Sequence, residues 1–408
     1  MKTTEMKTEN ILVITFWSYK DALVQTYALP YVKMIRELLP KESKIFIVTF
    51  EQPQMSLTEI EREATNIELN KINIELVAFP YKRFGIKKLI ASLGHVIAMI
   101  KIVKGKKIDT IHAFGPNAGS YGYLVSKITG KDLVIDSFEP HAEAMVENGT
   151  WKRNGIAHFI LGKFEKLQAK RAKHLIGTSS GMYDYSIKNY GYEPKSFFVK
   201  PACVDTRFFY PRKKDVELVN DFKLDGKIVC VYAGKLGGIY LEEEFFDFLK
   251  TCFEFWGDSF RCVMVTNADR KLIDKLMYKV DLPARVLISR FVPHDQVPRY
   301  LSLGDFAINP VKPVPTKRYC TSIKDGEYWA MGLPVVISPN ISDDSEIISR
   351  EDIGGVTNFT NKENMLNVIK KINVLISIKN NQKEKIVSIA KKYRSYGIAQ
   401  KIYTEIYA

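Results

Sequence analysis

Short apolar runs alternate with longer amphipathic stretches along the whole chain. In the first half, the runs with strand character are residues 11–15, 44–49, 74–78, 110–113, 133–136 and 175–178. In the second half, they are 227–233, 262–266, 285–288, 306–309 and 334–337. Strands that alternate with helix-length segments predict parallel sheets covered by helices on both faces. The predicted fold class is therefore α/β.

The domain organisation follows from chain length and from one irregular stretch. A chain of 408 residues is too long for a single core, since domains average roughly 150 residues. Residues 194–211 have no helical period and are bracketed by prolines, which places the interdomain connection near 200–212. We predict a domain over 1–200, a second over 201–385, and a helix over 386–408 that packs back on the first.

Composition narrows the class of protein. The hydrophobic share of 46% and charged share of 26% are those of a soluble globular chain. Residues 1–7 are polar and lead directly into the first strand, which leaves no room for the apolar core of a secretory signal. The five cysteines lack the spacing of a disulfide framework or a zinc site. We expect a cytoplasmic protein with reduced thiols.

Net charge is the first feature that points to a partner. An excess of +14 favours a nucleic acid, an anionic membrane or a phosphorylated ligand. The chain has no aromatic and basic motif of a known nucleic-acid-binding module, so we expect no nucleic acid.

Residues 81–107 hold eight basic residues and no acidic one around the apolar run 89–103. That run is shorter than the ~20 residues needed to span a bilayer. Either it is a core helix with solvated lysines, or it lies on an anionic membrane surface. The basic residues are Lys82, Arg83, Lys87, Lys88, Lys101, Lys104, Lys106 and Lys107.

Residues 322–336 carry the most information about chemistry. They combine a polar loop, a helix expected to begin near Asp325 or Gly326, a glycine at the helix end and a β-branched strand. A helix N-terminus binds anions, and Ser322 and Lys324 add a donor and a charge for a diphosphate. Glu327, in the first turn, can accept both hydroxyls of a ribose. Capping of an ordinary strand–helix unit explains the same residues, so spacing alone does not decide.

Two further segments follow predicted strands. In the turn 234–238, Gly234 and Gly237 let backbone approach a pyrophosphate and Lys235 supplies charge; an ordinary tight turn is the alternative. In residues 136–143, Glu139, His141 and Glu143 are polar, but alternating residues in an extended loop do not converge on a metal without a fourth ligand. We expect neither metal nor cofactor, and a purely structural His141 stays open.

The pattern Ser-x-Lys-x-x-Glu-Tyr-x-Ala-x-Gly-x-Pro-Val-Val, which starts at Ser322, resembles the donor-nucleotide signature of the group 1 (family four) glycosyltransferases of the GT-B fold. Weaker matches occur in the same order at 108–113, 172–182, 199–209, 301–305 and 402–407. The resemblance implies two Rossmann-like domains with parallel sheets facing across a central cleft. It also implies a nucleotide-sugar donor and a glycan or lipid-linked acceptor, as in polysaccharide or glycoconjugate biosynthesis.

The resemblance also implies roles for single residues. Gly234, Gly237, Ser322, Lys324 and Glu327 would bind the donor. His141, Glu139 and Lys235 would form the catalytic set of a metal-independent, retaining, hexosyltransferase-like enzyme. Lys235, Lys324 and backbone N–H groups would stabilise the leaving diphosphate. Such an enzyme is expected in the cytoplasm, with peripheral attachment to the inner face of the cell membrane left open.

Two departures from the family pattern keep other functions open. Tyr319 stands eight residues before Glu327, where the family often has a first glutamate. The paired glycines of the N-terminal loop are absent after Thr15. The alternatives are a GT-B-like protein that binds a sugar nucleotide without transfer, and a sugar-nucleotide epimerase of the same fold.

Overall fold

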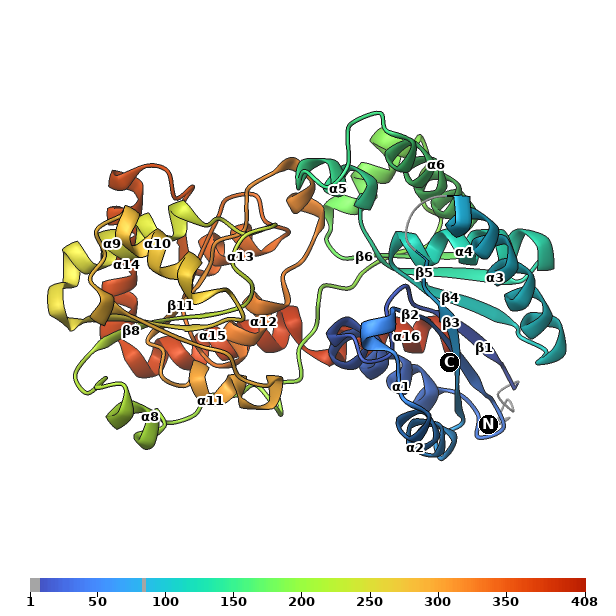
Figure 1. Cartoon of the computed structure of the whole chain (residues 1–408), viewed down its shortest axis with the longest axis horizontal. Coiled ribbons are helices and arrows are strands. Elements are labelled where there is room, and N and C mark those ends of the chain that lie inside the picture. The colour runs from blue at the N-terminus through green and yellow to red at the C-terminus, as the bar shows by residue number, and fades with distance from the viewer. Residues whose placement is uncertain (1–7, 83–85) are drawn as a thin grey trace, which may run out of the picture. The chain divides into compact units, whose positions relative to one another are not determined.

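The computed structural model describes residues 8–82 and 86–408, without the side chains of 86–90 and 379–380. The polar start at 1–7 and Arg83 therefore lie outside the described residues, as do the side chains of Lys87 and Lys88. The chain forms two compact units (Figure 1). Unit 1 comprises residues up to Pro201 together with Gly397–Ala408, and unit 2 comprises Ala202–Tyr396.

Among its described residues, unit 1 contains a seven-stranded parallel sheet of order β3-β2-β1-β4-β5-β6-β7. Strands β1, β2 and β4 are buried along their whole length because helices cover both faces of the sheet. The short β7 is half-buried, and its three apolar residues are too short a run to be recognised as a strand from the sequence pattern. The strands are β1 (Ile11–Ile14), β2 (Ile45–Glu51), β3 (Ile74–Pro80), β4 (Thr110–Phe114), β5 (Asp132–Phe138), β6 (His174–Gly177) and β7 (Phe197–Val199).

The helices of unit 1 mostly connect consecutive strands, as a parallel sheet requires. They are η1 (Leu23–Ala28), α1 (Leu29–Leu38), η2 (Pro53–Met55), α2 (Glu59–Asn70), α3 (Ile86–Gly105), α4 (Gly115–Thr129), α5 (His141–Glu147), α6 (Ile156–Arg171), α7 (Gly181–Tyr185), η3 (Ser186–Tyr190) and α16 (Tyr396–Tyr407). On α3, Met99 and Val103 are buried, whereas Leu93 and Ile97 are more than half exposed, at 60% and 55%. Among the described residues, none of the helices combines the length and apolar character needed to cross a bilayer.

The C-terminal helix α16 is held on unit 1 by buried polar contacts. Tyr403 donates its hydroxyl to Asp136 Oδ2 at 2.6 Å, and His112 Nδ1 lies 2.7 Å from the Tyr407 hydroxyl. The ammonium of Lys200 lies 3.2 Å from Asp136 Oδ1. Burial by itself raises the pKa of Asp136, but Lys200 and the hydrogen bonds from His112 and Tyr403 outweigh it and hold that pKa below its usual range.

Unit 2, whose backbone is described throughout, contains a six-stranded parallel sheet of order β10-β9-β8-β11-β12-β13. The glycines of β13 mask its apolar pattern, and the sequence analysis missed that strand. The strands are β8 (Ile228–Ala233), β9 (Phe260–Val265), β10 (Leu287–Arg290), β11 (Phe306–Asn309), β12 (Val335–Ile337) and β13 (Gly354–Val356).

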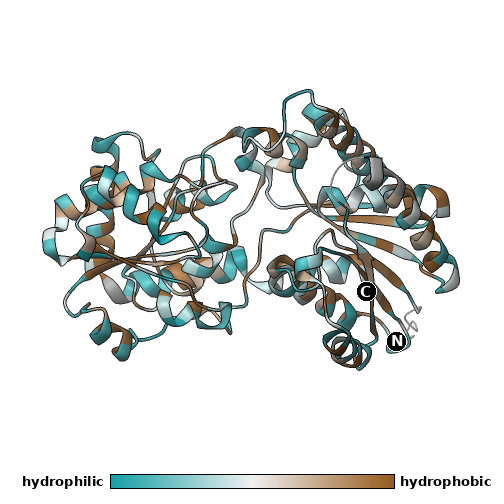
Figure 2. Cartoon of the chain, viewed as in Figure 1, coloured by the Kyte–Doolittle hydropathy of each residue, from teal (hydrophilic) through white to brown (hydrophobic). Residues whose placement is uncertain are grey.

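The two faces of this sheet carry separate hydrophobic cores. Along β8, Val229, Val231 and Ala233 join one buried cluster, while Cys230 and Tyr232 join the other. This alternation is the pleat of a strand that is covered on both sides. Figure 2 shows the apolar residues concentrated on the strands and on the helix faces that meet them.

The helices of unit 2 are α8 (Val216–Asp221), α9 (Glu243–Trp256), η4 (Gly257–Ser259), α10 (Arg270–Lys279), η5 (Ala284–Val286), η6 (His294–Gln296), α11 (Val297–Leu301), η7 (Pro315–Tyr319), α12 (Ile323–Ala330), α13 (Asp344–Glu351), α14 (Lys362–Ser377) and α15 (Lys379–Arg394). Helix α15 buries Ile386, Ile389 and Ala390 in the core of unit 2. The sequence analysis assigns 386–408 to one segment, whereas the structure divides it, with residues from Gly397 onward in unit 1.

Candidate functional site

Helix α12 begins at Ile323, two residues before the earlier of the two predicted starts. Ser322 is its extended N-cap residue, with φ −93° and ψ 124°, and its side chain makes no capping hydrogen bond. Glu327 is consequently the fifth residue of the helix and lies in its second turn, not in the first as predicted. The expected glycine stop is present, since Gly332 has φ +76° just after the helix.

Two buried aromatic side chains hold α12 against the sheet. Tyr328 and Trp329 are both fully buried in the core of unit 2. The Tyr328 hydroxyl accepts a hydrogen bond from the backbone N–H of Ala233 at 2.9 Å. This contact ties the helix to the last residue of β8, directly before the turn 234–238.

Lys324 points toward that same turn. Its side chain is only 8% exposed, and its ammonium lies 3.7 Å from the ring centre of Tyr240. A Cβ atom at position 234 would stand 2.2 Å from Lys324 Cε and 2.6 Å from Nζ. Gly234 is therefore required so that the ammonium can lie against the turn.

A second glycine in the turn accommodates an acid that the sequence analysis did not select. Gly237 has φ +77°, and a Cβ there would stand 1.8 Å from Glu242 Oε1. Lys235 is exposed, and its carbonyl accepts a hydrogen bond from the Tyr232 hydroxyl. The structure thus brings Gly234, Lys235, Gly237 and Lys324 together at one edge of the sheet.

The carboxylate of Glu327 is nearly buried but has no strong partner among the described residues. Glu327 is 8% exposed, and its carboxylate makes no hydrogen bond to another described residue. Its ion-pair contact is with His294 Nε2, at the long distance of 3.9 Å, and His294 is half exposed. A carboxylate in such a place keeps its acceptor capacity for hydroxyl groups that come from outside the chain.

A cavity of about 360 Å³ lies at the carboxyl ends of β9 and β10. This cavity was not predicted, because the sequence does not show that the aromatic side chain of Phe291 is 73% exposed beside it. Because β8, β9 and β10 are parallel neighbours, this cavity lies at the same sheet edge as the turn 234–238. Its lining residues are Thr266, Asn267, Ala268, Ser289, Arg290 and Phe291.

Beneath the start of α12 lies a cluster of fully buried polar side chains. Asn309 Nδ2 donates to both carboxylate oxygens of Asp325, at 2.8 and 2.9 Å. Arg394 donates to Asp344, to the Ser322 carbonyl at 3.1 Å and to the Ala202 carbonyl at 3.0 Å. The cluster therefore fixes the residue from which α12 starts.

The charges of this cluster do not balance if both acids are ionised, because two carboxylates face one guanidinium. Burial raises the pKa of Asp325 to about 6, although Arg394 and Asn309 oppose the shift. Burial also raises the pKa of Asp344 well above its usual value. Asp344 and Asp325 lie 50 and 69 positions before Arg394 in the chain. No local sequence pattern links residues so far apart, so the cluster could not be predicted from the sequence.

In unit 1, Glu139 and His141 lie after β5, as predicted. The chain kinks there, since the pairing of β5 with β6 shifts register between Ile135 and Phe138. His141 is the first residue of α5, and its Nδ1 lies 3.2 Å from Glu139 Oε1. Both side chains are a little over one quarter exposed.

The start of α5 is anchored by an acid that the sequence analysis missed. Glu165 accepts a hydrogen bond from the Ala142 N–H at 2.8 Å and another from the Tyr190 hydroxyl at 3.0 Å. Burial raises the pKa of Glu165 to about 7.

Glu143, the third candidate residue of the segment 136–143, contacts His158 at 2.7 Å. Over residues 8–82 and 86–408, no group of three or more potential ligands is arranged to hold a metal ion.

Two Rossmann-like units, each a parallel sheet with helices on both faces, define the GT-B fold. The predicted fold class is thus confirmed. No protein-family model matches the chain, and a search of curated proteins finds no match.

Solved structures of similar fold cover almost the whole chain. HepE from Anabaena, solved in complex with UDP, matches with a TM-score of 0.73 at 15% identity, over 97% of this chain and 99% of the other. Sucrose-phosphate synthase from Thermosynechococcus elongatus matches with a TM-score of 0.72 at 14% identity, over 98% of each chain. WaaG, a glycosyltransferase involved in lipopolysaccharide biosynthesis, matches with a TM-score of 0.69 at 15% identity, over 97% and 99%. At these identities the likeness establishes the fold.

Proposed function

We propose that the protein is a glycosyltransferase that moves a sugar from a nucleotide-sugar donor to a glycan or lipid-linked acceptor. The observation that carries the proposal is Glu327, a nearly buried carboxylate that makes no hydrogen bond to the described part of the chain, at the edge of the sheet where ligands of such folds bind. Its assigned role is to accept the two ribose hydroxyls of the donor.

The neighbouring groups suit the rest of a nucleotide. Lys324, Lys235 and the N–H groups of the turn 234–238 supply positive potential for a diphosphate. The cavity at Thr266–Phe291 offers a place for a flat base, with polar groups from Asn267 and Ser289 at its wall. Since HepE was solved with UDP and with UDP-glucose, a uridine donor is the first candidate.

In the proposed reaction, the bond between the anomeric carbon and the diphosphate oxygen breaks, and that oxygen keeps the electron pair. The lysines and backbone N–H groups stabilise the resulting charge. The acceptor hydroxyl bonds to the anomeric carbon, and its proton passes to the leaving phosphate. The family resemblance supports retention of configuration and a role for His141, oriented by Glu139, at the sugar and the acceptor.

Lipid-linked acceptors are favoured by the neighbours WaaG and WaaB, whose names place them in lipopolysaccharide synthesis. The exposed pair Leu93 and Ile97 on a helix rich in lysine offers a contact with an anionic membrane surface. We therefore include in the proposal a peripheral attachment of the protein to an anionic membrane surface.

Titration of the protein with UDP tests the donor site. We expect Glu327→Ala to weaken UDP binding by at least roughly one hundredfold, because two hydrogen bonds to a charged acceptor are lost, each contributing about 1.5–3 kcal/mol. Calorimetry measures the affinity, and Glu384→Ala on the exposed face of α15 is the control. Equal UDP affinities for Glu327→Ala and the control would exclude the assigned role.

A panel of UDP, GDP and ADP sugars with product mass analysis tests the transfer step. His141→Ala is expected to lower turnover while UDP affinity stays unchanged. The rival function, binding without transfer, is favoured by Tyr319 in the position of the missing glutamate. A donor that binds tightly but gives neither glycoside nor hydrolysis would support that rival, whereas an isomerised donor would indicate an epimerase.

A further inference from the structure

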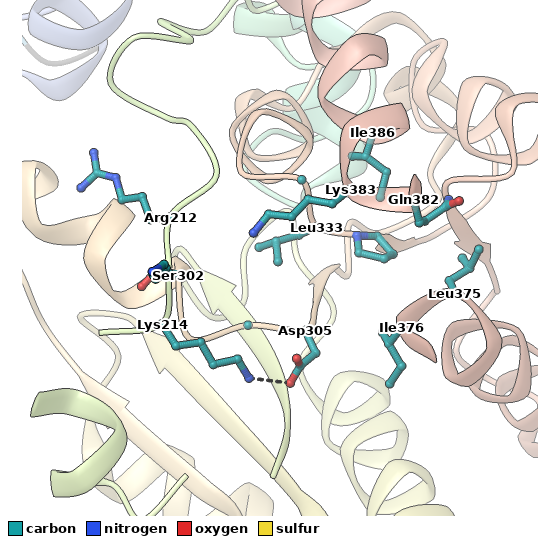
Figure 3. Close-up of a pocket in the computed structure, with 14 residues that line it drawn as sticks. Arg212, Lys214, Ser302, Asp305, Leu333, Leu375, Ile376, Gln382, Lys383 and Ile386 are labelled. Carbon is teal, nitrogen blue, oxygen red and sulfur yellow. Dashed lines mark hydrogen bonds and ion pairs between the residues drawn. The ribbon is translucent and has the colours of Figure 1, made fainter. Parts of the chain in front are cut away.

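Unit 2 has a second pocket, of about 230 Å³, beside residues that precede strands β11 and β12 (Figure 3). In a parallel sheet the amino ends of the strands share one edge, and ligands of the proposed kind bind at the other edge. The pocket is therefore separate from Glu327 and from the turn 234–238. Its volume is below the roughly 300–1,000 Å³ of pockets for drug-sized ligands, which indicates a smaller molecule than a nucleotide sugar.

Basic side chains from two distant segments meet at this pocket. Arg212, Lys213 and Lys214 come from the segment before α8, and Lys383 comes from α15. The lining thus has four basic residues against one acidic residue, Asp305, for a net charge of 4 − 1 = +3. Figure 3 shows Lys383 extended over Leu333 toward the side on which Arg212 and Lys214 lie, with Lys214 joined to Asp305.

The acid in the lining already has donors. Asp305 Oδ2 accepts from the Lys214 ammonium at 2.8 Å and from the Val229 N–H at 2.9 Å. It therefore fixes the position of Lys214. The excess of positive charge favours an anion from outside the chain.

Arg212 is held in place but has an unused donor. Its guanidinium lies 4.3 Å from the ring centre of Tyr210, and one terminal nitrogen donates to the Phe208 carbonyl at 2.8 Å. Its Nε is buried and has no hydrogen-bond partner among the described residues. Buried donors of this kind are normally satisfied, so a missing acceptor is indicated.

The opposite wall is apolar. Leu333, Leu375 and Ile386 are buried there, and Pro334 and Ile376 complete the wall. Lys383 lies over Gly332, where a Cβ would stand 2.5 Å from Lys383 Cγ. A ligand with an anionic end and a compact, less polar body matches both walls.

We propose that this pocket binds a small phosphate monoester, with its phosphate facing Arg212, Lys214 and Lys383 and its organic part facing Leu333 and Ile386. Arginine and lysine are the side chains that proteins use for phosphate, by bidentate hydrogen bonds and point charge respectively. The monoester is either a free phosphorylated metabolite or the headgroup of an anionic lipid. The site does not depend on the proposed transferase activity.

Calorimetric titration of the full chain with inorganic phosphate and with n-butyl phosphate tests the site. The variant Arg212→Ala/Lys383→Ala is compared with Lys271→Ala/Lys275→Ala, which removes the same charge from the exposed face of α10. We expect the pocket variant to bind phosphate at least tenfold more weakly than the control. We expect wild type to bind butyl phosphate more tightly than phosphate. Lys383→Gln alone, with its unfolding temperature measured, covers the case in which the double variant does not fold.

Sedimentation with phosphatidylcholine vesicles, with and without phosphatidic acid, separates the two sources. If the pocket variant loses only its binding to vesicles, the ligand is a lipid headgroup. If it loses only its binding to soluble phosphate, the ligand is a metabolite. Equal losses in the pocket and control variants would overturn the proposal, as would phosphate binding that disappears only in Lys324→Ala. Equal affinity for inorganic phosphate and n-butyl phosphate would overturn the proposed contact of the organic part with Leu333 and Ile386.

Discussion

At the scale of single residues, the geometry of the candidate donor site depends on the missing Cβ atom of Gly234. The ammonium of Lys324 lies against the turn 234–238 only because residue 234 has no Cβ. The sequence analysis named both Gly234 and Lys324 but gave them separate reasons, backbone approach for one and charge for the other. The structure shows that the glycine also makes room for the lysine. A contact between residues 90 positions apart cannot be read from either local pattern.

The contact between Gly234 and Lys324 gives a prediction with a matched control. Gly234→Ala is expected to displace the Lys324 ammonium and weaken UDP binding by about tenfold, which corresponds to ~1.4 kcal/mol. Gly238→Ala is the control, because it also places alanine at a positive φ, +64°, but its Cβ meets nothing within 4 Å. Calorimetry measures the affinities and thermal unfolding the stabilities. Comparable loss of affinity in both variants would mean that backbone strain, and not the lysine, is responsible.

Among the secondary-structure elements, helix α12 was predicted correctly at its end but not at its start. The predicted end of the helix at Gly332 is correct, because a glycine with a proline two residues later is a strong local stop signal, and Gly332 has the positive φ expected of such a glycine. The start was misplaced, because it depends on Arg394 and on the Ser322 carbonyl, which come together only in the folded unit. Tertiary contacts fix the start of this helix, and local propensity fixes its end.

The buried acids under α12 predict a dependence of stability on pH. Burial raises the pKa of Asp325 from 3.8 to about 6. The protonated Asp325 carboxyl therefore stabilises the folded unit fully below about pH 4, and this stabilisation is lost as the pH rises through 6. In Asp325→Asn, the urea midpoint of unit 2 should decline less between pH 4 and 7 than in wild type.

Glu165→Gln serves as the comparison, since Glu165 titrates in unit 1 with a pKa raised to about 7. In a background with Trp17→Phe and Trp151→Phe in unit 1, tryptophan fluorescence reports on unit 2 through Trp256 and the buried Trp329. If the pH profile of that signal is the same in Asp325→Asn as in wild type, the raised pKa of Asp325 is wrong.

At the scale of the whole molecule, the chain returns to its first unit for its last helix. Helix α15 is held in unit 2 by apolar burial and by the hydrogen bonds of Arg394, whereas α16 is held in unit 1 by the hydroxyls of Tyr403 and Tyr407. The periodic pattern of residues 386–408 is continuous and gives no sign of this division. Both helices are amphipathic, and amphipathicity alone does not specify which core a helix joins.

The docking of α16 predicts that one hydroxyl stabilises unit 1. Tyr403→Phe removes a 2.6 Å hydrogen bond to the buried carboxylate of Asp136 and is expected to cost about 1.5–3 kcal/mol. Tyr393→Phe on α15, whose hydroxyl contacts Glu351 near the surface, is expected to change stability by less than ~1 kcal/mol. Hydrogen exchange of β4 and β5 measures the effect in unit 1. Unchanged protection of those strands in Tyr403→Phe would show that the hydroxyl contributes nothing.

The alternation of strands and helices, the α/β class and the stop of α12 can be read from the sequence, because they depend on apolar periodicity and on glycine and proline within a few residues. The charge excess and most residues of the candidate donor site can be read from it as well. Which polar groups meet in the interior, such as Asp325 with Asn309 and Arg394 with Asp344, depends on how the folded unit packs. Those contacts join residues far apart in the chain, and burial, which shifts their pKa values, exists only once the sheets and helices have packed.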